Sequence, residues 1–309
     1  MSENARLNKP WMVAVWPGMG HVAVTAGYYL MAKLGVHLLA EFRPLDLFDV
    51  EYVEVKGGLV RTGRLPRSRL FLWRDPAEGH DIVIFIGEAQ PPMGKYAFCR
   101  RLIEFARELG VERVFTFAAM ATEMRPEHPS RVFGAAADEE SLAELKRLEV
   151  EILEEGQIGG LNGVLLGVAG ESDLRGACLL GEIPHVFAQL PFPKASLAVL
   201  ETFATMAGLE IDLSEVREQA QTMDSKLEAL FAQMERAIGQ QEPTADEAPG
   251  AAQAEEKRLD PEDERRIEEL FEKAREDRSK AYELKRELDR LGIFRDYEDR
   301  FLDLFKRPG

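Results

Sequence analysis

Two different spacings of hydrophobic residues alternate along the first two-thirds of the chain. Short runs of β-branched and aromatic residues predict strands, and stretches with apolar residues three and four positions apart predict helices between them. Such alternation is typical of a parallel or mixed sheet that is covered by helices. The predicted strands are residues 11–16, 37–42, 51–55, 69–73, 81–86, 113–118 and 177–181, and the predicted helices are residues 21–34, 95–109, 139–148, 160–169 and 193–206.

The segment 81–86 is the clearest of these strands, because it is almost continuously apolar. A run of this kind suits a central strand that is buried on both faces. Gly35, Gly110 and Gly208 each follow a predicted helix, where a residue in the left-handed conformation is favoured as a cap. We therefore expect residues 1–212 to form an α/β core domain.

Beyond this domain the apolar residues follow a heptad. Residues 213–238 predict a long helix, and residues 239–258 predict a flexible linker because they combine prolines and a glycine with many alanine, glutamate and glutamine residues. Residues 259–309 predict a charged helical segment. The seam of the first heptad helix consists of Val216, Ala220, Met223, Leu227, Leu230, Met234 and Ala237.

A second heptad seam runs through the charged segment. Asp260 and Pro261 suit an N-cap and a first helical position, and Gly292 suits a C-terminal cap, so one helix of about 45 Å is expected between them. A last amphipathic turn follows. The two seams either pack as an antiparallel pair on the same molecule or dock on a partner. The second seam consists of Ile267, Leu270, Ala274, Asp277, Ala281, Leu284, Leu288 and Leu291, and the last turn carries Tyr297, Phe301, Leu304 and Phe305.

Charge and cysteine content limit the partners that we expect. The formal net charge of −16 argues against nucleic-acid binding, because that function requires clustered lysine and arginine. Cys99 and Cys178 lie in apolar stretches and predict buried free thiols in a reducing compartment. No segment resembles a signal peptide or a membrane span, so we expect a cytoplasmic protein.

The turn after the first predicted strand has a glycine motif that leaves two interpretations open. Gly18, Gly20 and Ala23 match the loose dinucleotide fingerprint, in which glycines let the backbone approach a pyrophosphate. Glu41, near the end of the next strand, is placed to bind a ribose hydroxyl. The other interpretation is a structural turn or a loop that faces another protein, because Pro17 enters the turn irregularly.

The remaining polar candidates follow predicted strands singly. His21, His128 and His185 lie in loops or helix starts, and none has a second ligand at metal-binding spacing. Glu88 directly follows the buried strand, where it either belongs to a site or caps the next segment. We find no nucleophile signature. We therefore expect no catalytic residue, no cofactor and no metal.

Several segments, taken in order, resemble the family of the second proteasome assembly chaperone and its archaeal and bacterial relatives. The resemblance covers roughly residues 11–238, and the order of the motifs carries it. These motifs are residues 16–23 (WPGMGHVA), 84–89 (IFIGEA), 132–136 (VFGAA), 159–166 (GGLNGVLL), 183–186 (IPHV) and 191–195 (PFPKA).

The resemblance implies a three-layer α/β/α domain of the phosphorylase/hydrolase-like kind, self-association and, in eukaryotic members, a scaffold role in proteasome ring assembly. We therefore expect a non-enzymatic, homo-oligomeric protein that binds a protein client, such as a proteasome-like ring. The alternatives are a nucleotide- or dinucleotide-binding enzyme that uses the Gly18–Gly20 turn and an interaction module centred on the C-terminal helices. The candidate functional loops carry Trp16, Pro17, Gly18, Gly20, His21, Glu88, His128, Gly160, Gly163, His185, Pro193 and Lys194.

Overall fold

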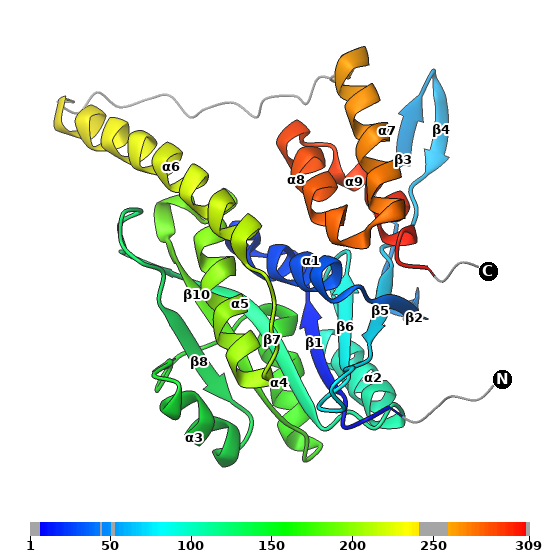
Figure 1. The fold of residues 1–309 in the computed structure, drawn as a ribbon, viewed down its shortest axis with the longest axis vertical. Helices are drawn as coiled ribbons and strands as arrows, with labels where there is room; N and C mark the ends of the chain where they lie inside the picture. The colour runs from blue at the N-terminus through cyan, green and yellow to red at the C-terminus, as the bar shows by residue number, and fades with distance from the viewer. Residues whose placement is uncertain (1–6, 44, 51–52, 241–258, 307–309) are drawn as a thin grey trace.

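A mixed sheet lies at the centre of the computed structural model, which describes residues 7–43, 45–50, 53–240 and 259–306. Within these residues the sheet has eight strands in the order β2-β5-β6-β1-β7-β10-β8-β9 (Figure 1). The strands are β1 (Trp11–Val15), β2 (His37–Phe42), β5 (Ser68–Trp73), β6 (Ile82–Gly87), β7 (Arg113–Thr122), β8 (Val132–Ala136), β9 (Glu151–Ile152) and β10 (Arg175–Pro184).

Four neighbouring strands, β6, β1, β7 and β10, run parallel at the centre of this sheet. β5 and β8 pair antiparallel on either side of them. β1 and β6 are buried along their whole length, as their apolar runs predict. Because the parallel strands end at one edge, their following loops gather there; we call this the carboxyl edge.

Helices cover both faces of the sheet, which confirms the predicted three-layer α/β/α architecture. One face packs in a single hydrophobic core with α1 (Val22–Leu34) and α5 (Pro193–Ala207). The opposite face packs with α2 (Lys95–Glu108) and α4 (Gly160–Glu171). α3 (Glu139–Arg147) contacts the outer strands β8, β9 and β10.

Four strands differ from the prediction, and three of them were not predicted at all. The strand predicted at residues 51–55 does not join the main sheet; β3 (Val53–Lys56) pairs with β4 (Leu59–Thr62) in a separate hairpin, and residues 51–52 lie outside the described part. The turn of this hairpin requires Gly57 and Gly58, both at positive φ. β8 and β9 were not predicted, because one is interrupted by a glycine and the other has only two residues.

The first heptad helix, α6 (Ser214–Gln240), packs on α5 of the same chain. Val216, Ala220 and Leu227 of its seam are buried, whereas Leu230 is 38% exposed. The side chains of Met234 and Ala237 lie outside the described residues. The predicted linker was given as starting at residue 239, but α6 continues to Gln240, and residues 241–258 lie outside the described part. The first half of the seam therefore stabilises the α/β domain itself.

The prediction of a single helix between residues 261 and 291 is wrong. Asp277 has an extended backbone (φ −136°, ψ 103°) and ends α7 (Pro261–Glu276). Its carboxylate then accepts a hydrogen bond from the N–H of Ser279 and caps the turn that leads into α8 (Ala281–Leu291). Aspartate favours this capping role over a helix interior, which explains the break.

α7, α8 and α9 (Phe294–Asp303) form a unit that packs on α1, and we call it the C-terminal helical unit. The expected caps are present: the carboxylate of Asp260 accepts from the N–H of Glu262, and Gly292 is left-handed. In the described residues the two heptad helices do not form the antiparallel pair that one of our interpretations required, because α6 packs on α5 and α8 packs on α1. Within the described residues the second seam is covered by its own chain, through Ile267, Leu270, Ala274, Ala281, Leu284 and Leu288.

Candidate functional site

The predicted functional residues gather along the carboxyl edge. Loops after β1, β6, β7 and β10 carry Trp16 to His21, Glu88, His128 and His185. The starts of α4 and α5 lie at the same edge, since Gly160 and Gly18 line one pocket and the N–H of Phe192 donates to the carbonyl of Gly20. The structure thus brings the candidate loops together, although their functional role stays a prediction.

The glycine turn after β1 forms its backbone hydrogen bonds within the chain. Gly20 and His21 both have positive φ, at 61° and 52°. Their N–H groups donate to the carbonyls of Ala188 and Gly18 at N···O distances of 2.8 and 3.1 Å. These two donors are therefore occupied, although a pyrophosphate site would need such N–H groups free.

Two further side chains fit a dinucleotide site poorly. Glu41 lies on β2, which is separated from β1 by β5 and β6, and its carboxylate pairs with Arg43 and Arg67. Trp16 is fully buried against Phe85 and Phe98 and belongs to the core. The turn is thus an internal structural element whose outer residues, Pro17 to Met19, face solvent.

The candidate histidines and Lys194 take part in loop contacts. The carbonyls of Pro126 and His128 accept hydrogen bonds from Nζ of Lys194, which also pairs with Asp224 of α6 at 2.9 Å. His185 Nδ1 lies 3.3 Å from the carbonyl oxygen of Thr122. These contacts hold the loop after β7 against the start of α5, which Lys194 also ties to Asp224 within α6, and this is a positioning role. Pro193 is the buried first residue of α5.

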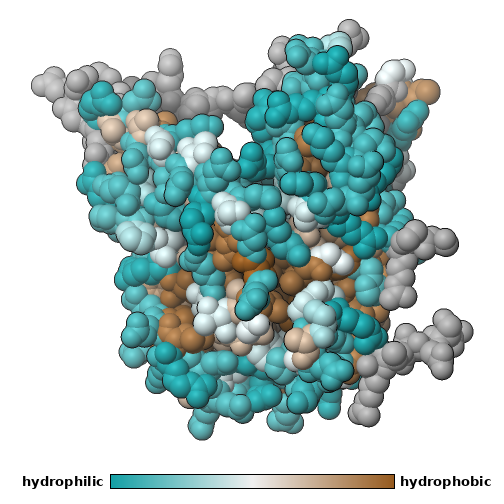
Figure 2. All heavy atoms as spheres, viewed as in Figure 1, coloured by the Kyte–Doolittle hydropathy of each residue, from teal (hydrophilic) through white to brown (hydrophobic). Residues whose placement is uncertain are grey.

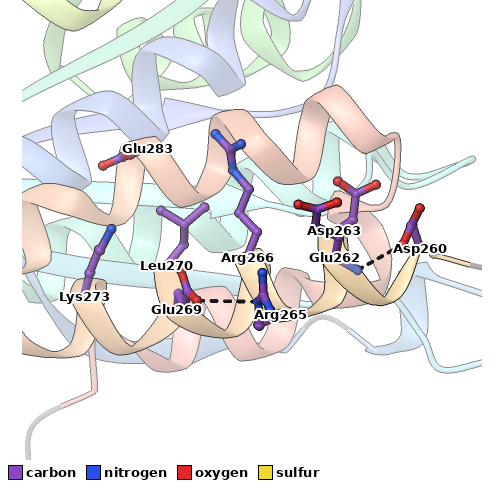
Figure 3. Close-up of a pocket in the computed structure, with 9 residues that line it drawn as sticks. All are labelled: Asp260, Glu262, Asp263, Arg265, Arg266, Glu269, Leu270, Lys273 and Glu283. Carbon is purple, nitrogen blue, oxygen red and sulfur yellow. Dashed lines mark hydrogen bonds and ion pairs between the residues drawn. The ribbon is translucent and has the colours of Figure 1, made fainter.

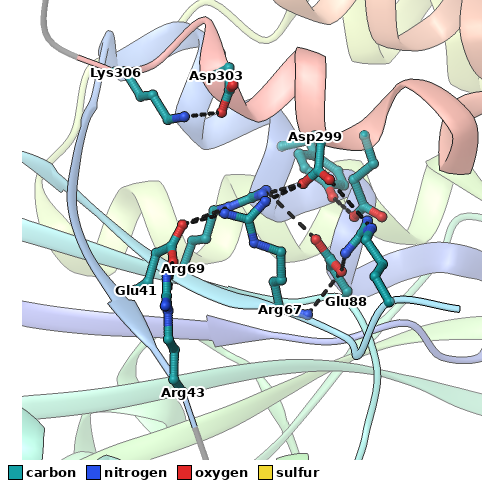
Figure 4. A network of polar contacts seen from close by, with 11 residues as sticks. Glu41, Arg43, Arg67, Arg69, Glu88, Asp299, Asp303 and Lys306 are labelled. Carbon is teal, nitrogen blue, oxygen red and sulfur yellow. Dashed lines mark hydrogen bonds and ion pairs between the residues drawn. The ribbon is translucent and has the colours of Figure 1, made fainter. Parts of the chain in front are cut away.

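Glu88 belongs to an ion network that was not predicted (Figure 4). Its Oε2 accepts from Nη1 of Arg64 at 2.6 Å and from the N–H of Arg67 at 2.9 Å. Arg69, only 2% exposed, lies beside it and pairs with Asp299 of α9. A buried guanidinium requires such partners, so the network fastens α9 to the sheet. Glu88 is therefore neither a free site carboxylate nor a cap for the following segment.

The pKa values of two neighbouring carboxyl groups of α9, Glu298 and Asp299, are shifted in opposite directions. Burial opposes the ionisation of Asp299, but the hydrogen bond from Arg69 and the charges of Arg64 and Arg67 outweigh it, so its pKa lies below the usual value. Burial raises the pKa of Glu298 above the usual value. Sequence reasoning missed this network because its members come from distant parts of the chain.

A second buried carboxylate, Glu182 at the end of β10, was also missed. It is 2% exposed and accepts from Nη2 and Nε of Arg131, at 2.7 and 2.8 Å, and from the hydroxyl of Thr122 at 2.7 Å. The hydrogen bonds from Arg131, more than the opposing burial, hold the pKa of Glu182 below its usual value. This two-point pair closes the loop between β7 and β8 onto β10.

The cleft between the ends of β1 and β7 holds a pocket of about 530 Å³. Gln90 is one of its lining residues, and Oε1 of this side chain accepts a hydrogen bond of 3.0 Å from the N–H of Leu161 in the first turn of α4. Asn162 lines the pocket and is 9% exposed, and its Oδ1 has no hydrogen-bond partner. Neither amide was predicted. The motif of residues 159–166 contained the only signal, because its glycines bring a backbone close to the cleft.

Glycine is required at both candidate positions on α4. Gly160 has a φ of 70°, and a Cβ on Gly163 would lie 2.0 Å from the carbonyl oxygen of Ile158. The start of α4 therefore approaches the preceding loop more closely than any side chain would permit. Gly160 lines the pocket, and Gly163 fixes the close approach behind it.

A second hollow lies on the C-terminal helical unit. A groove of about 420 Å³ along α7 is lined almost wholly by charged side chains, among them Arg265 and Glu269, which form an ion pair (Figure 3). A solvated helix face has this composition. Across the described part of the chain, no cluster of three metal-ligating side chains occurs. Cys99 and Cys178 are buried free thiols, and burial raises the pKa of each to about 12.

Exposed apolar side chains gather at two places. One group lies in the loops and helix starts of the carboxyl edge, and another on the β3–β4 hairpin, which projects at the upper right of Figures 1 and 2. A monomer gains nothing from such groups in water, and they are typical of surfaces that bind proteins. The edge group is Met19, Met93, Tyr96, Val186 and Leu190, and the hairpin group is Val53, Val55, Leu59 and Val60.

None of the helices in the described part of the chain is long and apolar enough to span a membrane.

The sequence model of the PAC2 family matches residues 12–231. The match ends on α6, before the C-terminal helical unit begins. An uncharacterized protein of Methanocaldococcus jannaschii is 27% identical over 220 residues, which are 69% of this chain and 80% of that protein.

Solved structures share the α/β architecture. PbaB of Pyrococcus furiosus, an archaeal proteasome activator, is 26% identical with a TM-score of 0.62, and the match covers 74% of this chain and 96% of PbaB. A PAC2 family protein from Streptomyces avermitilis is 28% identical with a TM-score of 0.63, and the match covers 75% of this chain and 100% of that one.

Proposed function

This chain belongs to the PAC2 family, and from that premise we propose that it is a non-enzymatic, assembly-chaperone-like protein that binds a protein client and associates with itself. PbaB, a relative at 26% identity, is an archaeal proteasome activator. A ring of proteasome subunits is therefore the first client to test. The expected location is the cytoplasm, which cell fractionation checks.

The exposed apolar side chains of the carboxyl edge support this function most directly. Met19, Met93 and Leu190 come from three different loops, after β1, β6 and β10, and each is at least 40% exposed. These loops rest on a rigid sheet and helix core, as binding loops commonly do. Burial of such a patch against a client would stabilise a complex by the hydrophobic effect.

The polar groups of the same edge support binding over catalysis. Glu88, Lys194 and Glu182 are each held by several hydrogen bonds or ion pairs within the chain. A general base or nucleophile requires a group that is within reach of a substrate and poised to react. The charged groups of this edge instead position its loops.

Capture of clients tests the edge directly. The intact protein, immobilised, is exposed to lysate of its source cells, with and without the substitutions Met19→Ser, Met93→Ser and Leu190→Ser together. We expect ring-forming subunits to be captured by the unchanged protein and lost from the triple variant. Leu230→Ser, which removes an exposed apolar residue from α6, is the control and should capture the same proteins. Equal capture by all three forms would show that this edge is not the binding surface.

Self-association is tested separately, by sedimentation velocity over a dilution series. The β3–β4 hairpin is a suitable contact, since a two-stranded ribbon gains stability from packing and its opposed residues Val55 and Val60 are both exposed. We expect Val55→Ser with Val60→Ser to shift the protein toward monomer, and Leu230→Ser to leave the distribution unchanged. A protein that stays monomeric at every concentration would remove self-association from the proposal.

A further inference from the structure

Strand β7 continues beyond its neighbour β1. The pairing of these strands ends at Ala14 opposite Thr116, whereas β7 stays paired with β10 on its other side as far as Thr122. From Phe117 to Thr122, the edge that faces β1 has no strand partner within the described residues. Alternate backbone N–H and C=O groups of a strand point to such an edge, which therefore favours the addition of another strand.

The pocket of about 530 Å³ lies along this free edge, and many of the residues that line it are glycine or alanine. A Cβ added to Gly18 or Gly159 would meet no atom within 4 Å, so both positions border open space. Walls of glycine and alanine permit another polypeptide backbone to approach closely. The small lining residues are Gly18, Ala23, Ala118, Ala119, Ala121, Gly156, Gly159 and Gly160.

The polar groups of the pocket suit an uncharged donor. Asn162 is nine-tenths buried and its Oδ1 lacks a partner, which costs free energy until a donor occupies the pocket. Glu155 is the only ionisable residue among those that line it. A phosphate or carboxylate ligand would meet no cation here, whereas a peptide N–H supplies the missing donor.

We propose that the cleft between β1 and β7 binds an extended segment of a partner polypeptide. The segment adds as a strand to the free edge of Phe117–Thr122, a small apolar side chain enters the pocket, and one backbone N–H donates to Oδ1 of Asn162. Strand addition of this kind takes its affinity from backbone hydrogen bonds and its specificity from alternate side chains. The inference rests on the proposed protein-binding function and names the form in which a client is recognised.

A library of short peptides displayed on phage is selected on the intact protein, and the enriched peptides are synthesised with capped ends. Affinity is measured for the unchanged protein, for Gly159→Phe, which fills the pocket, and for Gly167→Phe on the exposed side of α4, where an added Cβ also meets no atom. We expect Gly159→Phe to weaken binding at least about tenfold and Gly167→Phe to leave it unchanged. Equal melting temperatures of the two variants exclude misfolding as the cause.

Two readouts identify strand addition itself. N-methylation of alternate peptide amides should abolish binding, and the unmodified peptide should slow hydrogen–deuterium exchange in Phe117–Thr122. The inference is wrong if every peptide binds the unchanged protein and Gly159→Phe with equal affinity. It is also wrong if N-methylated peptides bind as tightly as unmodified ones. Capture of clients by Gly159→Phe, with loss only in the Met19, Met93 and Leu190 variant, would reject this inference and leave the proposed function standing.

Discussion

The hydroxyl of Tyr28 on α1 donates a hydrogen bond of 2.7 Å to Oε1 of Glu298 on α9. The rings of Phe294 and Phe301 pack edge-on against Tyr28, with centroids 5.1 and 5.6 Å away. A helix near the start of the chain therefore shares a buried aromatic and polar contact with the C-terminal helical unit.

Glu298→Gln should flatten the pH dependence of stability. Burial raises the pKa of Glu298 in the folded protein, so the folded state binds more protons than the unfolded state between the usual and the raised value. Stability of the unchanged protein therefore falls as pH rises through this window. Glutamine stays neutral and keeps an oxygen for the hydroxyl of Tyr28, so urea unfolding at about pH 7 should show a variant that is at least as stable. A clear loss of stability in the variant at this pH would contradict the assignment.

Glu182→Gln should have the opposite pH dependence. The hydrogen bonds from Arg131 lower the pKa of Glu182, so its contribution is present above the usual carboxyl pKa and is lost as pH falls through the folded value. Loss of these charge-assisted bonds should cost about 1–2 kcal/mol near neutral pH, discounted because Arg131 is half exposed. The difference from the unchanged protein should shrink in acid. Urea unfolding at neutral and acidic pH measures both values, and a difference that is constant with pH would count against the pair.

Asp299→Ala should loosen the C-terminal helical unit. The substitution leaves the buried Arg69 without its hydrogen-bonded partner, with Glu88 only at 3.6 Å. Removal of one member of a buried pair costs several kcal/mol, and we expect about 2 kcal/mol here because Asp299 is partly exposed. Limited proteolysis should cut α7–α9 faster. Asp303→Ala on the same helix removes only the surface pair with Lys306 and should change cleavage little; equal rates in both variants would refute a fastening role.

Gly27→Ala should destabilise the protein although alanine favours helices. Gly27 lies on α1 where an added Cβ would be 2.6 Å from Cγ2 of Val15 on β1. Overpacking of this kind costs about 1–3 kcal/mol and exceeds the gain of about 1 kcal/mol from helix propensity. Gly167→Ala on α4 meets no atom and should show the gain alone. Thermal unfolding of both variants checks the opposite signs, and a stabilised Gly27→Ala would disprove the close contact.

Nucleotides should not stabilise the protein. The N–H groups of Gly20 and His21 are occupied. Glu41 is separated from β1 by two strands in the sheet order and pairs with two nearby arginines. Melting curves with and without NAD, ATP or AMP should therefore coincide. A rise in melting temperature that is lost on substitution within the Gly18–Gly20 turn would restore the enzyme hypothesis.

Local patterns were sufficient for the layers of the fold. β1 and β6 have continuous apolar runs, and α1 and α5 end at Gly35 and Gly208 as their caps predict. The break at Asp277 was missed because the heptad continues across it. The competing preference of an aspartate for a capping position decided the structure there.

The sequence predicted which loops form the candidate site, but it did not predict which polar side chains contact one another there. Glycine and proline motifs indicated the loops after β1 and before α4 and α5. Asn162, Glu182 and Arg69 gain their character from contacts between segments that are distant in the chain, and no local spacing predicts them.

The N–H of Leu38 on β2 donates to the carbonyl of Phe305 at 2.8 Å. A ribosome that makes this protein completes β2 long before it supplies this acceptor. Until Phe305 has left the exit tunnel, that amide is hydrated and the side of α1 that α9 covers is exposed to solvent. The growing polypeptide therefore depends on helices that are made after the α/β domain to close the structure that this domain begins.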